Sequence, residues 1–170
     1  VLVDNSGLIT ATDADYAVGV SLDSTSGVAT LVNSGVIRTH SILDGEVAVS
    51  GADGVQHVLN YGDIYGAAIT AGGDDVFTNG VGGTWHVTNH STDFGDGDDS
   101  IQNQLGGTIE LAFHGAIHLG ASGPAGNAFI NEGTIRVLGH GLIDMGASGS
   151  ASNLLPLENN GIIDFVDGST

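Results

Sequence analysis

A short pattern, Asn-x-Gly-x-Ile, recurs along the whole chain and limits what it can fold into more than any other feature. Two of the seven copies carry two extra residues before the glycine, and one has Trp in place of Ile. The copies begin at Asn5, Asn33, Asn60, Asn79, Asn103, Asn131 and Asn159. Their glycines follow one another at intervals of 28, 27, 21, 24, 26 and 28 residues. Self-similarity with a period of roughly 20–30 residues is the sequence signature of a solenoid.

Alignment of the seven copies separates an apolar pair of columns from a mixed, mostly polar one. The first apolar column is Ile9, Ile37, Ile64, Trp85, Ile109, Ile135 and Ile163. The second, just before the Asn-Gly bend, is Val3, Leu31, Val58, Phe77, Ile101, Phe129 and Leu157. One position beyond the first column the residues are Thr10, Arg38, Tyr65, His86, Glu110, Arg136 and Asp164. This alternation predicts two short strands in each copy, separated by a tight bend, with the apolar columns inside.

These columns predict an all-β fold, a parallel β-helix (β-solenoid) of about seven coils of 21–28 residues. Stacked coils turn each column into a ladder with rungs about 4.8 Å apart. A helical bundle is excluded because no gap between glycines exceeds eleven residues, and a mid-helix glycine costs about 1 kcal/mol relative to alanine. No break in composition divides the chain, so we expect one domain over residues 1–170, as a whole protein or as a segment of a longer repeat protein.

The charge balance of the chain excludes several classes of partner. Two arginines and no lysine stand against twenty acidic residues, which gives a net charge of −18. Such a chain is repelled by phosphate backbones and by anionic membrane surfaces, so we expect no nucleic-acid partner. No apolar run is long enough to span a bilayer, so we expect no membrane insertion. The absence of cysteine excludes disulfides and thiol catalysis.

The repeats resemble those of a known class of bacterial proteins. The segments Gly115–Ile135, Gly141–Ile163 and Gly73–Trp85 follow the pattern G-x-I-x-L-G-x-G…(D/N)-x-F-x-N-x-G-T-I, with local departures. This pattern is similar to the repeats of autotransporter-type passenger domains and related large surface adhesins. The resemblance implies a right-handed parallel β-helix at the bacterial cell surface or in the extracellular space. It also implies a role in adhesion or as a stalk.

One turn suggests a metal site. Residues Gly95–Ile101 match the G-x-G-x-D-x-U part of the calcium-binding repeat of β-rolls. A partial copy, Ala71–Phe77, lies 24 residues earlier, so the two turns are expected to stack. The predicted calcium ligands are Asp74, Asp75, Gly95, Gly97, Asp98 and Asp99.

The same turns have a second interpretation that needs no metal. The matching positions in four successive coils are Gln56, Asp75, Asp99 and Asn127. Polar side chains at such positions cap turns by hydrogen bonding to the backbone. The sequence therefore predicts either a polar corner ladder or a bound calcium, which would be the cofactor.

Two smaller features are also interpreted in two ways. His114 is expected to stack beneath His140, and His118 beneath Asp144, either as solvated surface groups or as ligands of a transition metal. Trp85 stands in an inward column that holds Ile in the other coils, which predicts a gap-filling core residue. The alternative for Trp85 is an exposed platform for a sugar.

Three functional hypotheses follow. The first is a secreted or cell-surface structural and adhesive β-solenoid that presents its outer face to a cell, glycan or matrix partner. The second is an extracellular filament subunit that self-associates end to end, because both end coils look unfinished. The third is a polysaccharide lyase or hydrolase, and it is disfavoured because Arg38 and Arg136 lie roughly 19 Å apart along the rod. The sequence therefore predicts no catalytic residues and a protein that is not an enzyme.

Overall fold

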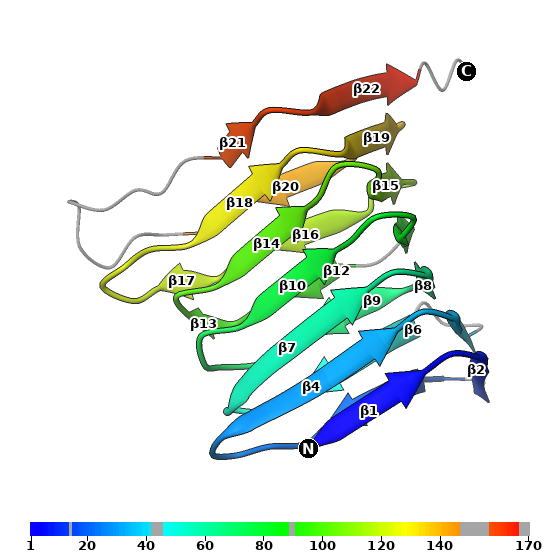
Figure 1. Ribbon diagram of the computed structural model, residues 1–170, viewed down its shortest axis with the longest axis vertical. Helices are drawn as coiled ribbons and strands as arrows, with labels where there is room; N and C mark the ends of the chain where they lie inside the picture. Colours follow the sequence, from blue (N-terminus) through cyan, green and yellow to red (C-terminus); the bar gives the residue numbers. More distant parts are fainter. Residues whose placement is uncertain (14, 42–45, 89–90, 147–156, 167–170) are drawn as a thin grey trace.

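The computed structural model describes residues 1–13, 15–41, 46–88, 91–146 and 157–166, and it shows a rod of stacked coils (Figure 1). In these residues the regular elements are β-strands, and there is no helix long and apolar enough to cross a membrane. Every strand pair in the three main sheets is parallel, because each coil lies on the coil before it. The prediction of an all-β parallel solenoid is confirmed.

Three long sheets form the walls of the rod. The first contains β1 (Leu2–Asn5), β4 (Val28–Asn33), β7 (Val55–Asn60), β10 (Val76–Asn79), β14 (Ser100–Asn103), β18 (Ala128–Asn131) and β21 (Leu157–Asn159). The second contains β2 (Leu8–Asp13), β5 (Val36–Ser41), β8 (Asp63–Tyr65), β11 (Thr84–Thr88), β15 (Thr108–Ala112), β19 (Thr134–Leu138) and β22 (Ile162–Val166). The third contains β3 (Ala17–Leu22), β6 (Glu46–Gly51), β9 (Ala67–Ile69), β12 (Ser91–Asp93), β16 (Ala116–His118) and β20 (Leu142–Asp144).

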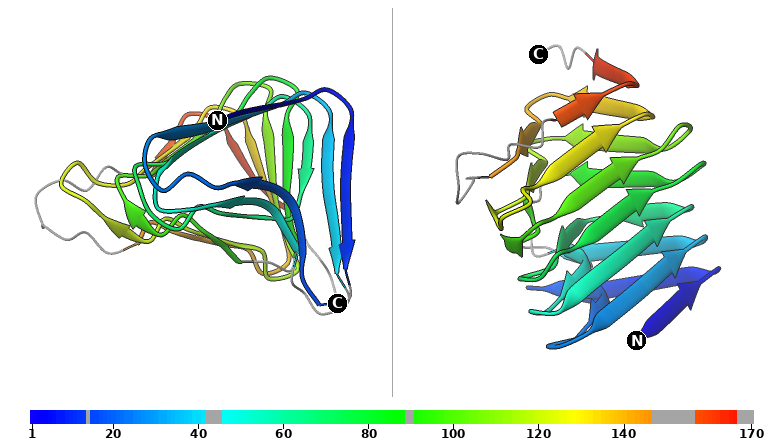
Figure 2. Two further views of the ribbon diagram at one scale, coloured as in Figure 1. Left: turned by 90° about the horizontal axis from the view of Figure 1, so that it is seen from below. Right: turned by 60° about the vertical axis from the view of Figure 1, so that its left-hand side comes forward.

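A fourth, two-stranded sheet of β13 (Asp96–Gly97) and β17 (Ala121–Ser122) lies at the corner between the third and first sheets. Figure 2 shows that the three long sheets enclose a roughly triangular core. Seen there from the N-terminal end, the chain runs clockwise from β1 through β2 to β3 as it recedes, so the solenoid is right-handed. The predicted number of about seven coils is slightly too high. Six coils supply a strand to all three long sheets, and only β21 and β22 of a further coil are described.

The register of the strands matches the columns predicted from the repeats. In the second sheet Ile109 pairs with Trp85 on one side and with Ile135 on the other. In the first sheet Ile101 pairs with Phe77 and with Phe129. These six side chains are fully buried in one continuous hydrophobic core. The inward assignment of both apolar columns is therefore confirmed, and it fixes which residues face outward.

A ladder of asparagine side chains runs along the rod at the bend between the first and second sheets. Each Nδ2 group donates to the Oδ1 atom of the asparagine in the next coil. The six distances, from Asn5–Asn33 through Asn131–Asn159, are 2.7, 2.8, 2.9, 2.9, 2.7 and 2.6 Å. Most of these side chains are fully buried, so the ladder satisfies polar groups that would otherwise be costly inside the protein. The Asn-x-Gly repeat is thus a device for stacking coils.

Trp85 fills space in the core beside an unusually short coil. Only 19 residues separate Asn60 from Asn79, and a single residue, Gly66, joins β8 to β9. The Trp85 ring stacks on Phe77 with 4.1 Å between ring centroids, and its Nε1 donates to the Gly66 carbonyl at 3.1 Å. The prediction of a gap-filling core residue is confirmed, because the Trp85 side chain is fully buried.

Candidate functional site

The outer face of the second sheet collects both arginines of the chain in one column. Strand register places seven outward residues in a row, one per coil: Thr10, Arg38, Tyr65, His86, Glu110, Arg136 and Asp164. We call the five central residues, from Arg38 to Arg136, the outer column. In a chain with a net charge of −18, this is where the scarce positive charge is concentrated.

Neighbouring side chains of the outer column contact one another along the rod. The Arg38 guanidinium carbon lies 4.4 Å from the centroid of the Tyr65 ring, which is a cation–π contact. On the other side of Tyr65, the His86 ring stacks with 4.1 Å between centroids and an angle of 4° between ring planes. Nδ1 of His86 lies 3.6 Å from Oε2 of Glu110, and Nη1 of Arg136 lies 4.0 Å from the same oxygen. The rung spacing of about 4.8 Å suits this face-to-face stacking.

His86 is held mainly in its neutral form. Burial lowers the pKa of His86, and the positive charge of Arg38 acts in the same direction. Glu110 and Asp63 act against this shift without cancelling it. Because the ordinary pKa of histidine is about 6.5, the ring is uncharged at neutral pH. The permanent positive charges of the outer column are therefore Arg38 and Arg136 alone.

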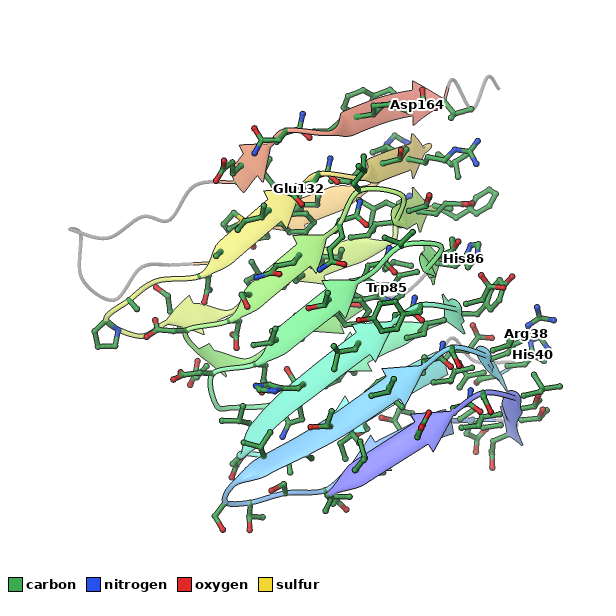
Figure 3. All side chains as sticks on the ribbon, in the orientation of Figure 1. Arg38, His40, Trp85, His86, Glu132 and Asp164 are labelled. Carbon is green, nitrogen blue, oxygen red and sulfur yellow. The ribbon has the colours of Figure 1, made fainter. Side chains whose placement is uncertain are left out.

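A surface cavity of about 240 Å³ lies beside the Arg38 end of the outer column. Its lining consists of Arg38, Thr39, His40, Glu46, Tyr65, Gly66 and His86. Figure 3 shows Arg38, His40 and His86 projecting from the same edge of the rod. Glu46 carries the one carboxylate of this lining, 3.4 Å from Nδ1 of His40, and it accepts a hydrogen bond from the Ser41 amide. Within the described parts of the chain, Arg38 has no carboxylate at ion-pair distance.

The acidic turns predicted as a metal site form the polar corner ladder. Oδ1 of Asp75 accepts a hydrogen bond from the Gln56 amide at 2.7 Å, and Oδ1 of Asp99 accepts one from the Asp75 amide at 2.9 Å. Oδ1 of Asn127 continues the series by accepting from the Asp99 amide at 3.0 Å. The predicted ladder of these four residues is confirmed, and it lies at the entry to strands of the first sheet.

Three oxygen atoms of this ladder are buried without a hydrogen-bond partner: Gln56 Oε1, Asp75 Oδ2 and Asp99 Oδ2. Burial is the main cause of a rise in the pKa of Asp75 to about 6 and of Asp99 to about 7. In the next coil, Nδ2 of Asn127 donates to the Leu119 carbonyl at 2.7 Å and to the Met145 carbonyl at 3.2 Å. At this ladder position the coil of Asn127 has a side-chain N–H donor, Nδ2. The two preceding coils have an acceptor oxygen there, Oδ2 of Asp75 and of Asp99.

The other two aspartates of the predicted metal site do not join this buried pair. Oδ1 of Asp74 accepts from the Asp98 amide at 2.9 Å, and the Asp98 carboxylate accepts from the amides of Ala125 and Gly126 at 3.0 and 2.7 Å. Asp75 and Asp99 are fully buried, whereas Asp74 is exposed and Asp98 is half-buried. Among the described residues no group of three or more His, Cys, Asp or Glu side chains could hold a metal ion. Calcium binding at these turns stays a prediction.

The glycines of the predicted metal turn have a role in chain packing. Gly95 has a φ angle of +79°, and a Cβ atom there would lie 1.4 Å from the Ala71 carbonyl oxygen of the previous coil. Ala71 stands where a glycine was expected, and it adopts the same left-handed conformation with a φ angle of +70°. The Gly97 carbonyl accepts a hydrogen bond from the Gly123 amide at 3.1 Å. The glycine at position 95 is therefore required by the stacking of coils.

The histidine pairs lie where the repeats placed them. The rings of His114 and His140 stack with 5.3 Å between centroids, and Nδ1 of His118 lies 3.3 Å from Oδ2 of Asp144. Each pair brings two side chains together, which is fewer than a transition-metal site normally uses.

Sequence reasoning identified the outer column as polar but missed its contacts and its cavity. The signal was present in the order of residues, because a cation, an aromatic ring, an imidazole, a carboxylate and a second cation succeed one another at rung distance. Comparisons of the chain with protein-family models, curated protein sequences and solved structures gave no match.

Proposed function

We propose that this chain is a structural and adhesive β-solenoid of the autotransporter-passenger type. In this proposal it works at a bacterial cell surface or outside the cell, and its outer column contacts a glycan on a cell or in a matrix. The observation that carries the proposal is the outer column itself. It joins both arginines, an aromatic ring and a cavity on one wall of the rod.

The chemistry of the outer column suits recognition. Arginine and tyrosine are enriched at protein interfaces, where they supply hydrogen bonds and large rigid contact areas. Tyr65 is held between Arg38 and His86, so little side-chain freedom remains to be lost on binding. The strands beneath are paired on both sides, which gives the column a rigid base.

The geometry favours recognition over catalysis. A lyase that takes both its base and its charge-neutralising cation from arginine or lysine is disfavoured, because Arg38 and Arg136 lie four rungs apart, roughly 19 Å. A hydrolase needs two accessible carboxyl groups across a substrate. Of the four aspartates of the predicted metal site, Asp75 and Asp99 are fully buried, Asp98 accepts two backbone amides, and only Asp74 is exposed.

Binding to glycan-coated surfaces tests the proposed function. The purified chain is applied to a glycan array and to bacterial and animal cells. Tyr65→Ala removes the central ring of the outer column, whereas Gln102→Ala changes an exposed residue on the first sheet. We expect Tyr65→Ala to lose binding and Gln102→Ala to keep it. Equal binding by both variants would place the contact elsewhere on the rod.

Self-assembly is the second candidate, and a specific observation favours it. Apolar side chains are exposed on both end coils, including Leu2, Leu8, Ile162 and Phe165 at 60 to 76% exposure. The asparagine ladder is also directional, because Asn5 presents its Oδ1 side at one end and Asn159 its Nδ2 side at the other. Two copies of the 170-residue chain can therefore continue the ladder head to tail, and such a contact does not close. Light scattering over a concentration series tests it, and a monomeric rod at every concentration would reject it.

A further inference from the structure

We propose that the cavity beside Arg38 binds a single carboxylate-bearing sugar residue, such as a uronic acid within a mostly neutral glycan. The inference rests on the proposed function, since it specifies the glycan that the outer column contacts. It follows from the state of the Arg38 side chain, from the size of the cavity and from the charges in its lining.

The N–H donors of the Arg38 guanidinium are available to a ligand. Its guanidinium lies over the Tyr65 ring, and this contact uses the flat face of the group. In the described residues the guanidinium takes part in no hydrogen bond and no ion pair with a carboxylate. A guanidinium carries five N–H donors in its plane, in a fork that matches the two oxygens of a carboxylate. By contrast, Arg136 lies 4.0 Å from the Glu110 carboxylate.

The outer column holds Arg38 in place before a ligand arrives. Tyr65 is stacked against Arg38 on one side and against His86 on the other, with the two rings within 4° of parallel. The His86 side is in turn fixed by the contact of its Nδ1 with Glu110. A cation fixed in this way loses little conformational entropy when it binds an anion.

The size of the cavity limits the ligand to a small one. Its volume of about 240 Å³ lies below the range of roughly 300–1,000 Å³ that is usual for sites of drug-sized molecules. One sugar ring is the appropriate scale. The Tyr65 hydroxyl and the His40 ring add groups of the lining that can hydrogen-bond to sugar hydroxyls.

The charges in the lining select a singly charged ligand rich in hydroxyl groups. The lining contains one arginine and also one carboxylate, that of Glu46, which would repel a second negative charge. A carboxylate such as Glu46 accepts hydrogen bonds from the several hydroxyls of a sugar, whereas the unprotonated oxygens of phosphate or sulfate offer it no donor. The net charge of −18 disfavours a polyanionic chain in the same way. A monoanionic sugar satisfies all three conditions.

Titration of the 170-residue chain with glucuronate, glucose and inorganic phosphate, followed by NMR or calorimetry, tests the inference. We expect glucuronate to bind at least roughly tenfold more tightly than glucose, because a charge-assisted hydrogen bond supplies that difference. Phosphate is expected to bind no better than glucose. Arg38→Gln should remove the preference for glucuronate, and the control variant Gln102→Ala, which alters an exposed residue of the first sheet outside the outer column, should retain it.

The controls separate failure of this inference from failure of the proposed function. Thermal melts of both variants test whether the fold is kept, which we expect because Arg38 and Gln102 are both exposed. Equal binding of glucose and glucuronate, or an unchanged preference in Arg38→Gln, would overturn the acidic-sugar assignment. If the array still shows Tyr65-dependent binding in that case, the adhesive function stands with a neutral ligand. Tighter binding of phosphate than of glucuronate would also overturn it, in favour of a simple anion site.

Discussion

Replacement of Asp99 by asparagine should make the protein more stable at neutral pH. Asp99 is fully buried, its Oδ1 accepts the Asp75 amide, and its Oδ2 has no partner. Asn127 shows that an amide fits this ladder position one coil later, with Nδ2 donating to backbone carbonyls. Asp99→Asn keeps the Oδ1 acceptor and replaces the unpartnered oxygen by a donor. The substitution therefore removes a buried charge without removing the rung.

The size of the effect follows from the pKa of Asp99. Its value in the folded chain is about 7, against an ordinary value of 3.8, mainly because of burial. A folded-state pKa above the unfolded one means that the proton stabilises the fold. This contribution is complete below pH 4 and is lost as the pH rises through 7. A rise of about three units corresponds to about 4 kcal/mol. Asp75, with a pKa of about 6, adds a similar but smaller loss over the same range.

Urea unfolding at pH 4.5 and pH 8, followed by circular dichroism, measures this effect. The unaltered chain should lose several kcal/mol of stability between the two pH values, and Asp99→Asn should lose clearly less. At pH 8 the variant should be the more stable protein, by up to about 4 kcal/mol. Asp98→Asn is the matched control. The Asp98 carboxylate accepts hydrogen bonds from two backbone amides, so the protein should become less stable when this charge is removed. A less stable Asp99→Asn at pH 8 would refute the reasoning.

Three further predictions follow from the ladders. Asn103→Ala should cost about 2–4 kcal/mol in urea unfolding, because it breaks two rungs of the asparagine ladder and leaves a buried acceptor unpaired; a loss below 1 kcal/mol would show that the ladder adds little. Ile109→Asp should unfold the chain at ambient temperature, since a carboxylate would enter the core, while Glu110→Ala should change stability by less than about 1 kcal/mol; similar melting temperatures would contradict the register. If the acidic turns bind calcium, millimolar calcium should raise the melting temperature of the unaltered chain but not that of a variant with both Asp75→Asn and Asp99→Asn; equal shifts would reduce the effect to charge screening.

The inward columns were predictable from the sequence because the repeat supplies an apolar residue at each of these positions in all seven copies. A single isoleucine such as Ile109 says little, but the same side-chain type at matching positions in the other coils fixes strand, register and facing together. The asparagine bends were predictable for the same reason. Between Trp85 and Phe94 this redundancy fails, since the residues there lack apolar alternation. The strand β12 forms in this stretch because it pairs with β9 on one side and with β16 on the other.

The contacts of the candidate site were harder to predict from the sequence, because they form between different residue types in adjacent coils. No position of the outer column repeats in the adjacent coil, so alignment gives only the average property of a polar column. The stacking of Tyr65 on His86 depends on rotamers that the repeat does not specify. At the acidic turns the sequence predicted the corner ladder, but it did not predict that one carboxylate oxygen each of Asp75 and Asp99 is buried without a hydrogen-bond partner.

The third sheet has a consequence for how the rod would carry a mechanical load. Its strands β9 and β12 are joined through one residue pair, Asp93 with Ile69, whereas the flanking coils share three or more. Because each coil touches only its neighbours, tension between the two ends passes through every junction in series. The weakest junction then sets the force at which the rod gives way. Among the described strand pairs of the third sheet, the junction between the third and fourth coils has the fewest paired residues. Pulled from its ends, the molecule would part there first, into two shorter stacks that each keep their own ladders.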